Sequence, residues 1–149
     1  MKILDFNERL KHSILIADGA MGSFLHESVG PQRCFDELNS TEPEAVFRVH
    51  QSYIEAGAHI IETNTFGANR FKLTPLGLAD EVQRLNSRGV KIAREAFGGR
   101  DGYVLGDIGP VGAILEPYGD LTEAEARTAL EEQARALVDG CKLVKSFDL

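Results

Sequence analysis

The chain has 149 residues, of which 43% are hydrophobic and 26% charged, and its formal net charge is −7. This length and composition predict one soluble domain with a real core, and the negative charge argues against a nucleic-acid partner or an anionic membrane surface. The N-terminus has no apolar stretch of secretory length, and no apolar run is long enough to span a membrane, so we expect a cytoplasmic protein.

Short apolar segments that end in polar residues indicate a parallel sheet. The clearest is Ile14–Asp18, which is followed at once by Gly19 and a flexible loop. Similar segments begin near His59 and Tyr103, and a fourth strand is expected at Leu143–Phe147. Because the carboxyl ends of parallel strands meet at one edge of a sheet, the polar residues of the first three segments are placed for ligand binding there.

Amphipathic periodicity predicts three helices between these strands. Thr41 with Glu44, and Thr122 with Glu125, match the capping box that starts a helix. The stretch from about residue 19 to residue 40 is expected to be irregular. The predicted helices cover residues 41–57, 80–97 and 122–139.

The alternation of strands and helices predicts an α/β fold with about four parallel strands. The strands start about 40 residues apart, which is the length of a βα unit with a generous loop. Such a chain fits either a small doubly wound sheet or the first half of a (β/α)8 TIM barrel, which normally needs about 200–250 residues. The length alone does not choose between these two architectures.

The loop of residues 18–21, called here the Asp18 loop, is the first candidate ligand site. Asp18 is a carboxylate at a strand end, and Gly19, Ala20 and Met21 follow it with a backbone that a ligand can approach closely. A carboxylate beside exposed amides suits a zwitterion, with Asp18 for the ammonium group and the amides for the carboxylate. The alternative interpretation is that Asp-Gly simply forms a turn after the strand.

Polar residues close the second and third predicted strands. Thr63, Asn64 and their neighbours Glu62 and Thr65 either line a pocket or hydrogen-bond neighbouring loops, because buried polar groups need partners. Strand alternation places Glu62 and Asn64 on the face opposite Thr63 and Thr65. Asp107 either contacts a ligand or caps the turn that follows it.

The two cysteines and four histidines do not predict a metal site by themselves. Cys34 and Cys141 lie far apart in the sequence and belong to no CxxC pair, so each is expected to be a small apolar filler or a free thiol. No two histidines are spaced as metal ligands around an acid, and the common phosphate-loop, dinucleotide and nucleophile motifs are absent.

Several collinear segments resemble the homocysteine S-methyltransferase family. The resemblance covers about residues 13–140 and is closer to the methionine-synthase branch than to the betaine branch. Several long matches in one order are more specific than a single motif. The matching segments are residues 17–22, 37–39, 49–58, 62–70 and 106–110.

The resemblance implies an eight-stranded (β/α) barrel with a catalytic zinc ion. In this family three cysteine thiolates hold the zinc, which binds and ionises the homocysteine sulfur so that it attacks a methyl donor. The resemblance further implies that Asp18 receives the homocysteine ammonium group and that the backbone of Gly19, Ala20 and Met21 lies near its carboxylate. Thr63, Asn64 and Asp107 would line the mouth nearby.

The sequence departs from the family pattern in two places. The family's zinc cysteines lie in an Asn-Cys segment and a Gly-Gly-Cys-Cys-Gly segment, and neither is present here, so no zinc role passes to Cys34 or Cys141. The resemblance ends near Gly140, and residues 141–149 diverge, with Phe147 about where the family has a glutamate that also holds the ammonium group. We therefore expect a partial domain that matches the N-terminal half of the barrel, produced by a truncation, an altered reading frame or a splice variant.

Two functions from different classes follow. The leading one is the N-terminal half of a homocysteine S-methyltransferase that forms methionine, inactive alone, with a methyl donor (methylcobalamin, methylfolate, betaine or a methylsulfonium compound) that the sequence does not identify. The alternative is a non-catalytic α/β module that binds a small amino acid through the Asp18 loop. A half barrel also has two unpaired strand edges, so we expect self-association or pairing with a C-terminal half barrel.

Overall fold

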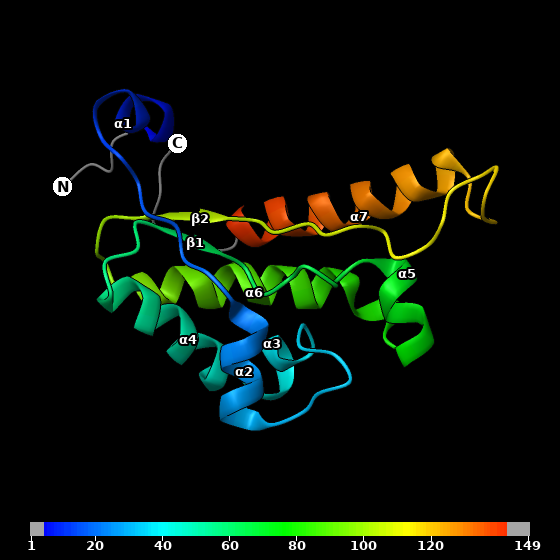
Figure 1. The fold of residues 1–149 in the computed structure, drawn as a ribbon, viewed down its shortest axis with the longest axis horizontal. Coiled ribbons are helices and arrows are strands. Elements are labelled where there is room, and N and C mark those ends of the chain that lie inside the picture. Colours follow the sequence, from blue (N-terminus) through cyan, green and yellow to red (C-terminus); the bar gives the residue numbers. More distant parts are fainter. Residues whose placement is uncertain (1–4, 143–149) are drawn as a thin grey trace.

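Helices packed against a short parallel sheet make up the described part of the chain, which is residues 5–142 of a computed structural model (Figure 1). The strands are β1 (Ile60–Glu62) and β2 (Tyr103–Leu105). The expected fourth strand at Leu143–Phe147 lies outside the described residues. The helices are α1 (Phe6–His12), α2 (Met21–Val29), α3 (Leu38–Thr41), α4 (Pro43–Glu55), α5 (Arg70–Leu73), α6 (Val82–Phe97) and α7 (Glu123–Lys142), with 3-10 turns at Thr74–Leu76 and Ala79–Glu81.

The sheet runs in the order Ile14–Asp18 segment, β1, β2, with all three segments parallel. β1 and β2 pair in the register Ile60 with Tyr103. The Ile14–Asp18 segment is not the regular strand that its sequence predicts, because its backbone pairs with β1 only as an isolated bridge between Ala17 and Ile60. There the Asp18 amide donates to the Ile60 carbonyl at 2.9 Å. The described residues therefore contain two parallel strands and one bridged segment, in place of three full strands.

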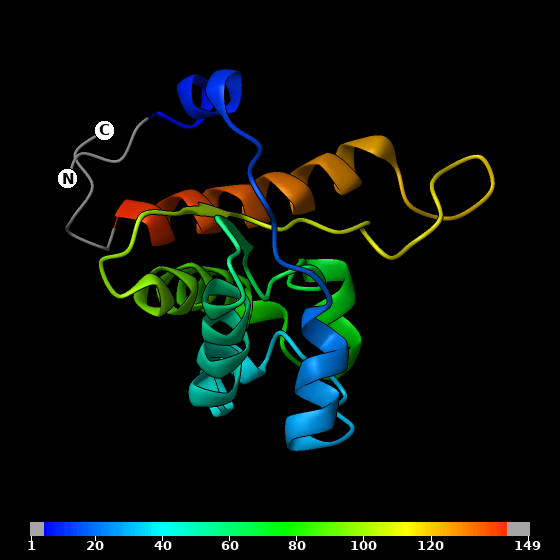
Figure 2. The same ribbon diagram turned by 60° about the vertical axis from the view of Figure 1, so that its left-hand side comes forward.

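α4, α6 and α7 form a row of helices, in which α6 contacts both of the others, and this row covers one face of the sheet (Figures 1 and 2). Ile61 of β1 is fully buried against this row. Val104 of β2 packs against the same cluster, as its register with Ile61 requires. The buried residues of this cluster are Ile54, Ile61, Ala93, Ala96 and Phe97.

The third predicted helix is present as α7, and its capping box is confirmed. The Thr122 amide donates to Glu125 Oε2 at 2.9 Å, and the Glu125 amide donates to Thr122 Oγ1 at 3.2 Å. α7 does not stop at Gly140 as expected. Gly140 lies inside the helix at a place of close packing, because a Cβ atom there would lie only 2.7 Å from the Cα atom of Ser87 in α6. Gly140 is therefore a contact point between two helices.

The capping box predicted at Thr41 is wrong. Thr41 is the last residue of α3, and its hydroxyl donates to the Glu37 carbonyl at 3.2 Å. α4 begins two residues later at Pro43, in a first turn where proline is tolerated. The predicted helix over residues 80–97 is present as α6, which starts at Val82 after a 3-10 turn.

The prediction that residues 19–40 are irregular is also wrong. This stretch contains α2 and α3, and Leu25 of α2 is fully buried against Leu38, Val46 and Val49. α2 is only nine residues long, and helices of this length depend on tertiary packing. Within residues 5–142, no helix combines the length and the apolar character that crossing a bilayer requires.

Candidate functional site

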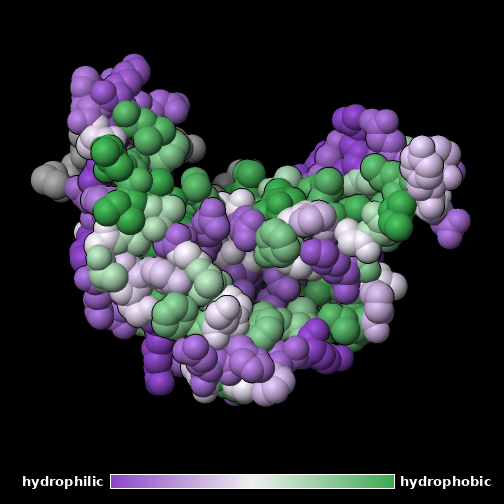
Figure 3. All heavy atoms as spheres, viewed as in Figure 1, coloured by the Kyte–Doolittle hydropathy of each residue, from purple (hydrophilic) through white to green (hydrophobic). Residues whose placement is uncertain are grey.

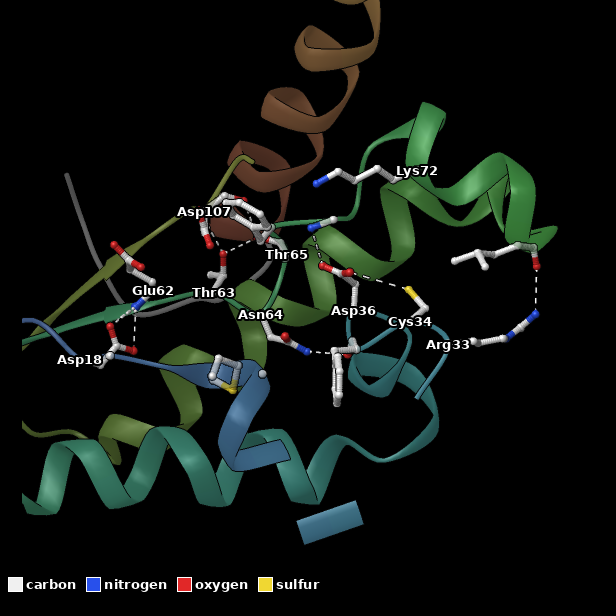
Figure 4. A pocket seen from close by; sticks show the side chains of 17 residues that line it. Asp18, Arg33, Cys34, Asp36, Glu62, Thr63, Asn64, Thr65, Lys72 and Asp107 are labelled. Carbon is white, nitrogen blue, oxygen red and sulfur yellow. Dashed lines mark hydrogen bonds between the residues drawn. The ribbon is translucent and has the colours of Figure 1, made fainter. Parts of the chain in front are cut away.

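A pocket of about 520 Å³ lies where the Ile14–Asp18 segment, β1 and β2 end (Figure 4). The structure therefore brings the three predicted strand ends together at one edge of the sheet. Six of the seven predicted site residues line this pocket. They are Asp18, Gly19, Met21, Thr63, Asn64 and Asp107. The seventh, Ala20, is not among the lining residues, and its carbonyl instead accepts a hydrogen bond from the Tyr53 hydroxyl at 3.2 Å.

Asp18 is held by the backbone of β1. Each of its two carboxylate oxygens lies 3.1 Å from the Glu62 amide nitrogen. The pKa of Asp18 is raised to about 6, mainly by burial and to a smaller extent by the nearby carboxylates of Glu62 and Asp107, while the hydrogen bond from the Glu62 amide opposes the shift. A cationic ligand would stabilise the ionised form of this partly desolvated carboxylate, because it replaces the water that burial removes.

The Asp18 loop leads directly into α2. Ala20 is the N-cap of α2, and no side chain accepts a hydrogen bond from the first-turn amides. Gly19 permits close packing, because a Cβ atom there would lie 3.3 Å from the Tyr53 hydroxyl oxygen. Met21 and Gly22 line the pocket at the start of the helix. Uncapped amides and the helix dipole favour an anionic group at this position.

Thr63 and Thr65 connect the end of β1 to the end of β2. Their hydroxyl oxygens lie 2.6 Å apart, which agrees with the expected placement of both side chains on one face. The Asp107 amide donates to Thr63 Oγ1 at 2.9 Å, and the Thr65 hydroxyl donates to the Asp107 carbonyl at 2.7 Å. Both threonines are buried, so these bonds satisfy their hydroxyls and fix the backbone of Asp107.

Asn64 lines the pocket but uses its amide group to hold a neighbouring loop. Its Nδ2 donates to the Phe35 carbonyl at 2.8 Å and to Asn39 Oδ1 at 3.2 Å. Asn39 in turn donates to the Asn64 carbonyl at 2.7 Å. The two interpretations of the polar residues after β1 are thus not exclusive, because the same residues line a pocket and satisfy loops.

The far side of the pocket contains residues that the sequence analysis did not select. The partly buried Asp36 accepts a hydrogen bond from the Gly67 amide at 2.9 Å, and desolvation raises its pKa. Lys72 Nζ lies 4.7 Å from the centroid of the Phe66 ring, as expected for a cation–π contact. Asp36 lies in the loop before α3 and Lys72 lies in α5, so the strand-end pattern pointed to neither of them.

Carboxylates dominate the β-strand side of the pocket. Asp18, Glu62 and Asp107 lie near one another there (Figure 4), and burial, followed by the charge of Glu62, raises the pKa of Asp107. Such a group of like charges attracts a cation and resists a second anion. Together with the start of α2, this arrangement suits a ligand with an ammonium group and a carboxylate group.

The described residues do not fit a zinc site. Among them no three His, Cys, Asp or Glu side chains are grouped so that they could hold a metal ion. Cys34 lies alone near Asp36, with its Sγ 3.7 Å from Asp36 Oδ2, and burial raises the pKa of its thiol to about 11. A protonated, buried thiol is a poor metal ligand, and an open catalytic zinc site normally needs three protein ligands.

The fold and the pocket define an α/β protein with its candidate ligand site at the carboxyl ends of parallel strands. The chain belongs to the homocysteine S-methyltransferase family, because the model of that family, Homocysteine S-methyltransferase, matches residues 15–144. The resemblance inferred from the sequence is thereby confirmed.

Curated relatives agree with this assignment. The chain is 35% identical over 148 residues to methionine synthase from Mycobacterium leprae (strain TN). It is 36% identical over 148 residues to methionine synthase from Mycobacterium tuberculosis (strain ATCC 25618 / H37Rv). Each match covers 91% of this chain but only 12% of the relative, so the chain spans a small part of those proteins.

Solved structures show the same fold. The metallated form of the homocysteine methyltransferase MmuM from Escherichia coli superposes with a TM-score of 0.73 at 22% identity, covering 89% of this chain and 53% of MmuM. The oxidized form gives a TM-score of 0.74 at 24% identity and covers 88% of this chain and 51% of MmuM. The described fold therefore corresponds to about half of the MmuM chain.

Proposed function

We propose that the chain supplies the homocysteine-binding half of a homocysteine S-methyltransferase, the enzyme that transfers a methyl group to the homocysteine thiol and forms methionine. One observation supports this function most directly. The carboxylate of Asp18 and the uncapped start of α2 lie together on a pocket at the carboxyl ends of the strands. Family membership indicates that the substrate is homocysteine. The carboxylate and the helix start match the ammonium group and the carboxylate group of that amino acid.

Each end of homocysteine has a suitable counterpart in the pocket. Asp18 would receive the ammonium group, with the carboxylates of Glu62 and Asp107 adding to the attraction. The amides at Met21 and Gly22 would receive the substrate carboxylate. Thr63 and Thr65 would act indirectly, by fixing the backbone of Asp107.

The fold is best interpreted as the first half of a (β/α)8 barrel. The parallel order of the Ile14–Asp18 segment, β1 and β2, each followed by helical segments, is that of successive βα units. The match to about half of MmuM supports the same interpretation. The described residues do not fit the zinc site, so we assign amino-acid binding to them and leave thiol activation and the methyl donor to other parts of an assembled enzyme.

Calorimetry with three ligands tests the binding proposal. We expect the chain to bind reduced L-homocysteine, and to lose about 10- to 100-fold in affinity for 4-mercaptobutanoate, which lacks the ammonium group. The Asp18→Asn variant should bind both ligands with similar, weak affinity. 3-Aminopropane-1-thiol, which lacks the carboxylate, tests the start of α2. The proposal fails if folded wild-type protein does not bind L-homocysteine, or if it binds 4-mercaptobutanoate equally well.

A non-catalytic amino-acid-binding module is the second candidate. The lack of a three-ligand cluster among the described residues favours it. A fusion of this chain to the part of MmuM outside the matched half separates the two candidates. With zinc, L-homocysteine and each of the four classes of methyl donor in turn, methionine formation that is lost in Asp18→Asn supports the enzyme half. A folded fusion that binds homocysteine but forms no methionine supports the module.

A further inference from the structure

Tyr53 of α4 contacts the Asp18 loop without lining the pocket. Its hydroxyl donates to the Ala20 carbonyl at 3.2 Å, and a Cβ atom at Gly19 would lie 3.3 Å from the same hydroxyl oxygen. Neither Tyr53 nor Ala20 is among the residues that line the pocket. Tyr53 therefore touches the two residues that join Asp18 to α2, from outside the space that a ligand would occupy.

Packing holds the ring of Tyr53 in place. The ring lies against the buried cluster that includes Leu25 and Val49. It also meets the Phe24 ring edge to face, with the centroids 5.5 Å apart and the planes at 72°. Because an aromatic side chain has few rotatable bonds, a packed ring fixes the position of its hydroxyl. Phe24 and Leu25 belong to α2, so α4 holds both this helix and the loop before it.

The hydrogen bond to Ala20 determines the direction of the Met21 amide. The Ala20 carbonyl and the Met21 amide belong to one planar, trans peptide group, in which they point in opposite directions. Because the carbonyl faces Tyr53, the amide is directed away from Tyr53. Met21 lines the pocket and is the first residue of α2, where an amide has no partner within the helix. Holding the carbonyl therefore orients a donor of the candidate site.

The Tyr53 hydroxyl keeps its proton in this position. Partial desolvation, followed by the charge of the nearby Asp18, raises the pKa of the phenol above its ordinary value of 10.0. The phenol is therefore neutral when Asp18 is ionised, and it remains a donor to the Ala20 carbonyl. The hydrogen bond is thus available over the whole pH range in which Asp18 can attract a cation.

We propose that Tyr53 is a positioning residue for the carboxylate end of an amino-acid ligand. By holding the Ala20 carbonyl, it keeps the Met21 amide oriented to receive that carboxylate, so less conformational freedom is lost on binding. This inference rests on the proposed function, in which the start of α2 receives the homocysteine carboxylate and Asp18 receives the ammonium group. Removal of the hydroxyl should therefore weaken recognition of one end of the ligand and spare the other.

NMR titration of the Tyr53→Phe variant with two ligands tests this role. The substitution removes the hydroxyl and keeps the ring, so the packing against α2 is retained. We expect the affinity for L-homocysteine to fall about three- to tenfold, as for the loss of one hydrogen bond. The affinity for 3-aminopropane-1-thiol, which has no carboxylate, should change by less than about twofold.

Tyr118→Phe is the matched control, because Tyr118 is 91% exposed and does not line the pocket. It lies in the loop of residues 111–121, which projects across the hollowed side of the molecule from α1 (Figure 3). The control should bind both ligands as the wild type does. An unchanged L-homocysteine affinity in Tyr53→Phe, or an equal loss of affinity for both ligands, overturns the positioning role.

Spectra of the ligand-free protein separate this role from the proposed function. Tyr53→Phe should move the amide resonance of Met21, because its peptide group loses a hydrogen bond, and Tyr118→Phe should not. Wild-type protein that binds no L-homocysteine overturns the proposed function, and with it the ligand role of Tyr53, even where the Met21 resonance moves. A Met21 resonance that stays in place, in protein whose wild type binds L-homocysteine, overturns the inference about Tyr53 alone.

Discussion

Both carboxylate oxygens of Asp18 accept from the backbone amide of Glu62, each at 3.1 Å. This contact joins the end of the bridged Ile14–Asp18 segment to the end of β1, and it places a carboxylate within the influence of two others, Glu62 and Asp107. Burial at this junction, with a smaller contribution from the charges of Glu62 and Asp107, raises the pKa of Asp18 to about 6, although the hydrogen bond from the Glu62 amide opposes the rise. Its ionisation state changes close to neutral pH.

Homocysteine affinity should depend on the ionisation of Asp18. The pKa of about 6 means that the carboxylate is charged above pH 6 and increasingly neutral below it, while the ligand's ammonium group stays protonated throughout. We expect affinity, measured by calorimetry, to fall about tenfold from pH 7 to pH 5. The Asp18→Asn variant should bind weakly with no such dependence. A wild-type affinity that is constant over this range would contradict the role of Asp18.

Asp18→Asn should also stabilise the fold at neutral pH. Because the folded pKa of about 6 lies above the ordinary value of 3.8, the folded state prefers the protonated form. The resulting penalty is absent below pH 3.8 and fully present above pH 6. An amide removes it, so we expect the free energy of unfolding to rise by about 1 kcal/mol at pH 8, after allowance for partial solvent exposure, with no gain near pH 4.

Urea denaturation of both proteins measures this effect. Asp5→Asn serves as the control, because Asp5 is an exposed carboxylate that caps α1 through the amides of Asn7 and Glu8. Its substitution should leave the free energy of unfolding nearly unchanged or slightly lower. Destabilisation by Asp18→Asn at pH 8 would show that the bonds to Glu62 outweigh the charge penalty.

His50 should make the fold sensitive to mild acid. It lies fully buried in α4, neither ring nitrogen has a hydrogen-bond partner among the described residues, and burial lowers its pKa to about 4. The unfolded chain binds a proton near pH 6.5, so stability is unaffected above that pH and falls as pH drops from 6.5 to 4, by up to about 3 kcal/mol.

His50→Leu should abolish most of that loss and add about 1 kcal/mol at pH 7, because it removes two buried, unpaired polar atoms. Chemical denaturation at a series of pH values measures both effects. The control is His26→Leu, because His26 is exposed in α2 and its removal should not alter the pH profile. An unchanged profile in His50→Leu would assign the acid sensitivity to other groups.

Thr63→Val should affect both stability and ligand binding. The substitution keeps the shape of the side chain but removes the acceptor of the Asp107 amide, which lies 2.9 Å from Thr63 Oγ1. An unpaired amide costs about 1–3 kcal/mol when it is buried, and the loop that positions Asp107 would be released. We expect a lower free energy of unfolding and weaker homocysteine binding. Thr74→Val is the control, because Thr74 is exposed and its hydroxyl donates only to the Arg70 carbonyl of its own helical turn. An equal loss of stability and affinity in both variants would refute the role of Thr63 in positioning Asp107.

Features that depend on neighbouring residues were predictable from the sequence. The capping box of Thr122 and Glu125 involves residues three apart, and it starts α7 where expected. The position of α6 followed in the same way from its amphipathic repeat. The family was identified from collinear segments, and the polar residues at three strand ends marked one edge of the sheet.

Other features depend on contacts between distant parts of the chain, and only the tertiary structure decides them. Thr41, like Thr122, is followed three residues later by a glutamate, as in a capping box. In the structure, however, Thr41 is the last residue of α3 and does not start a helix. α2 is stable because Leu25 is buried by residues from α3 and α4, which no local pattern shows.

The candidate site illustrates the same division. Asp18 was selected from the sequence because it is an acid at a strand end. Its contact with Glu62, 44 residues away, and the tie between Thr63 and Asp107 exist only after the parallel segments have aligned. Residue type is local information, whereas burial, hydrogen-bond partner and pKa belong to the assembled sheet edge. The sequence by itself determined which chemical groups are available, and the tertiary structure decided which of them face one another.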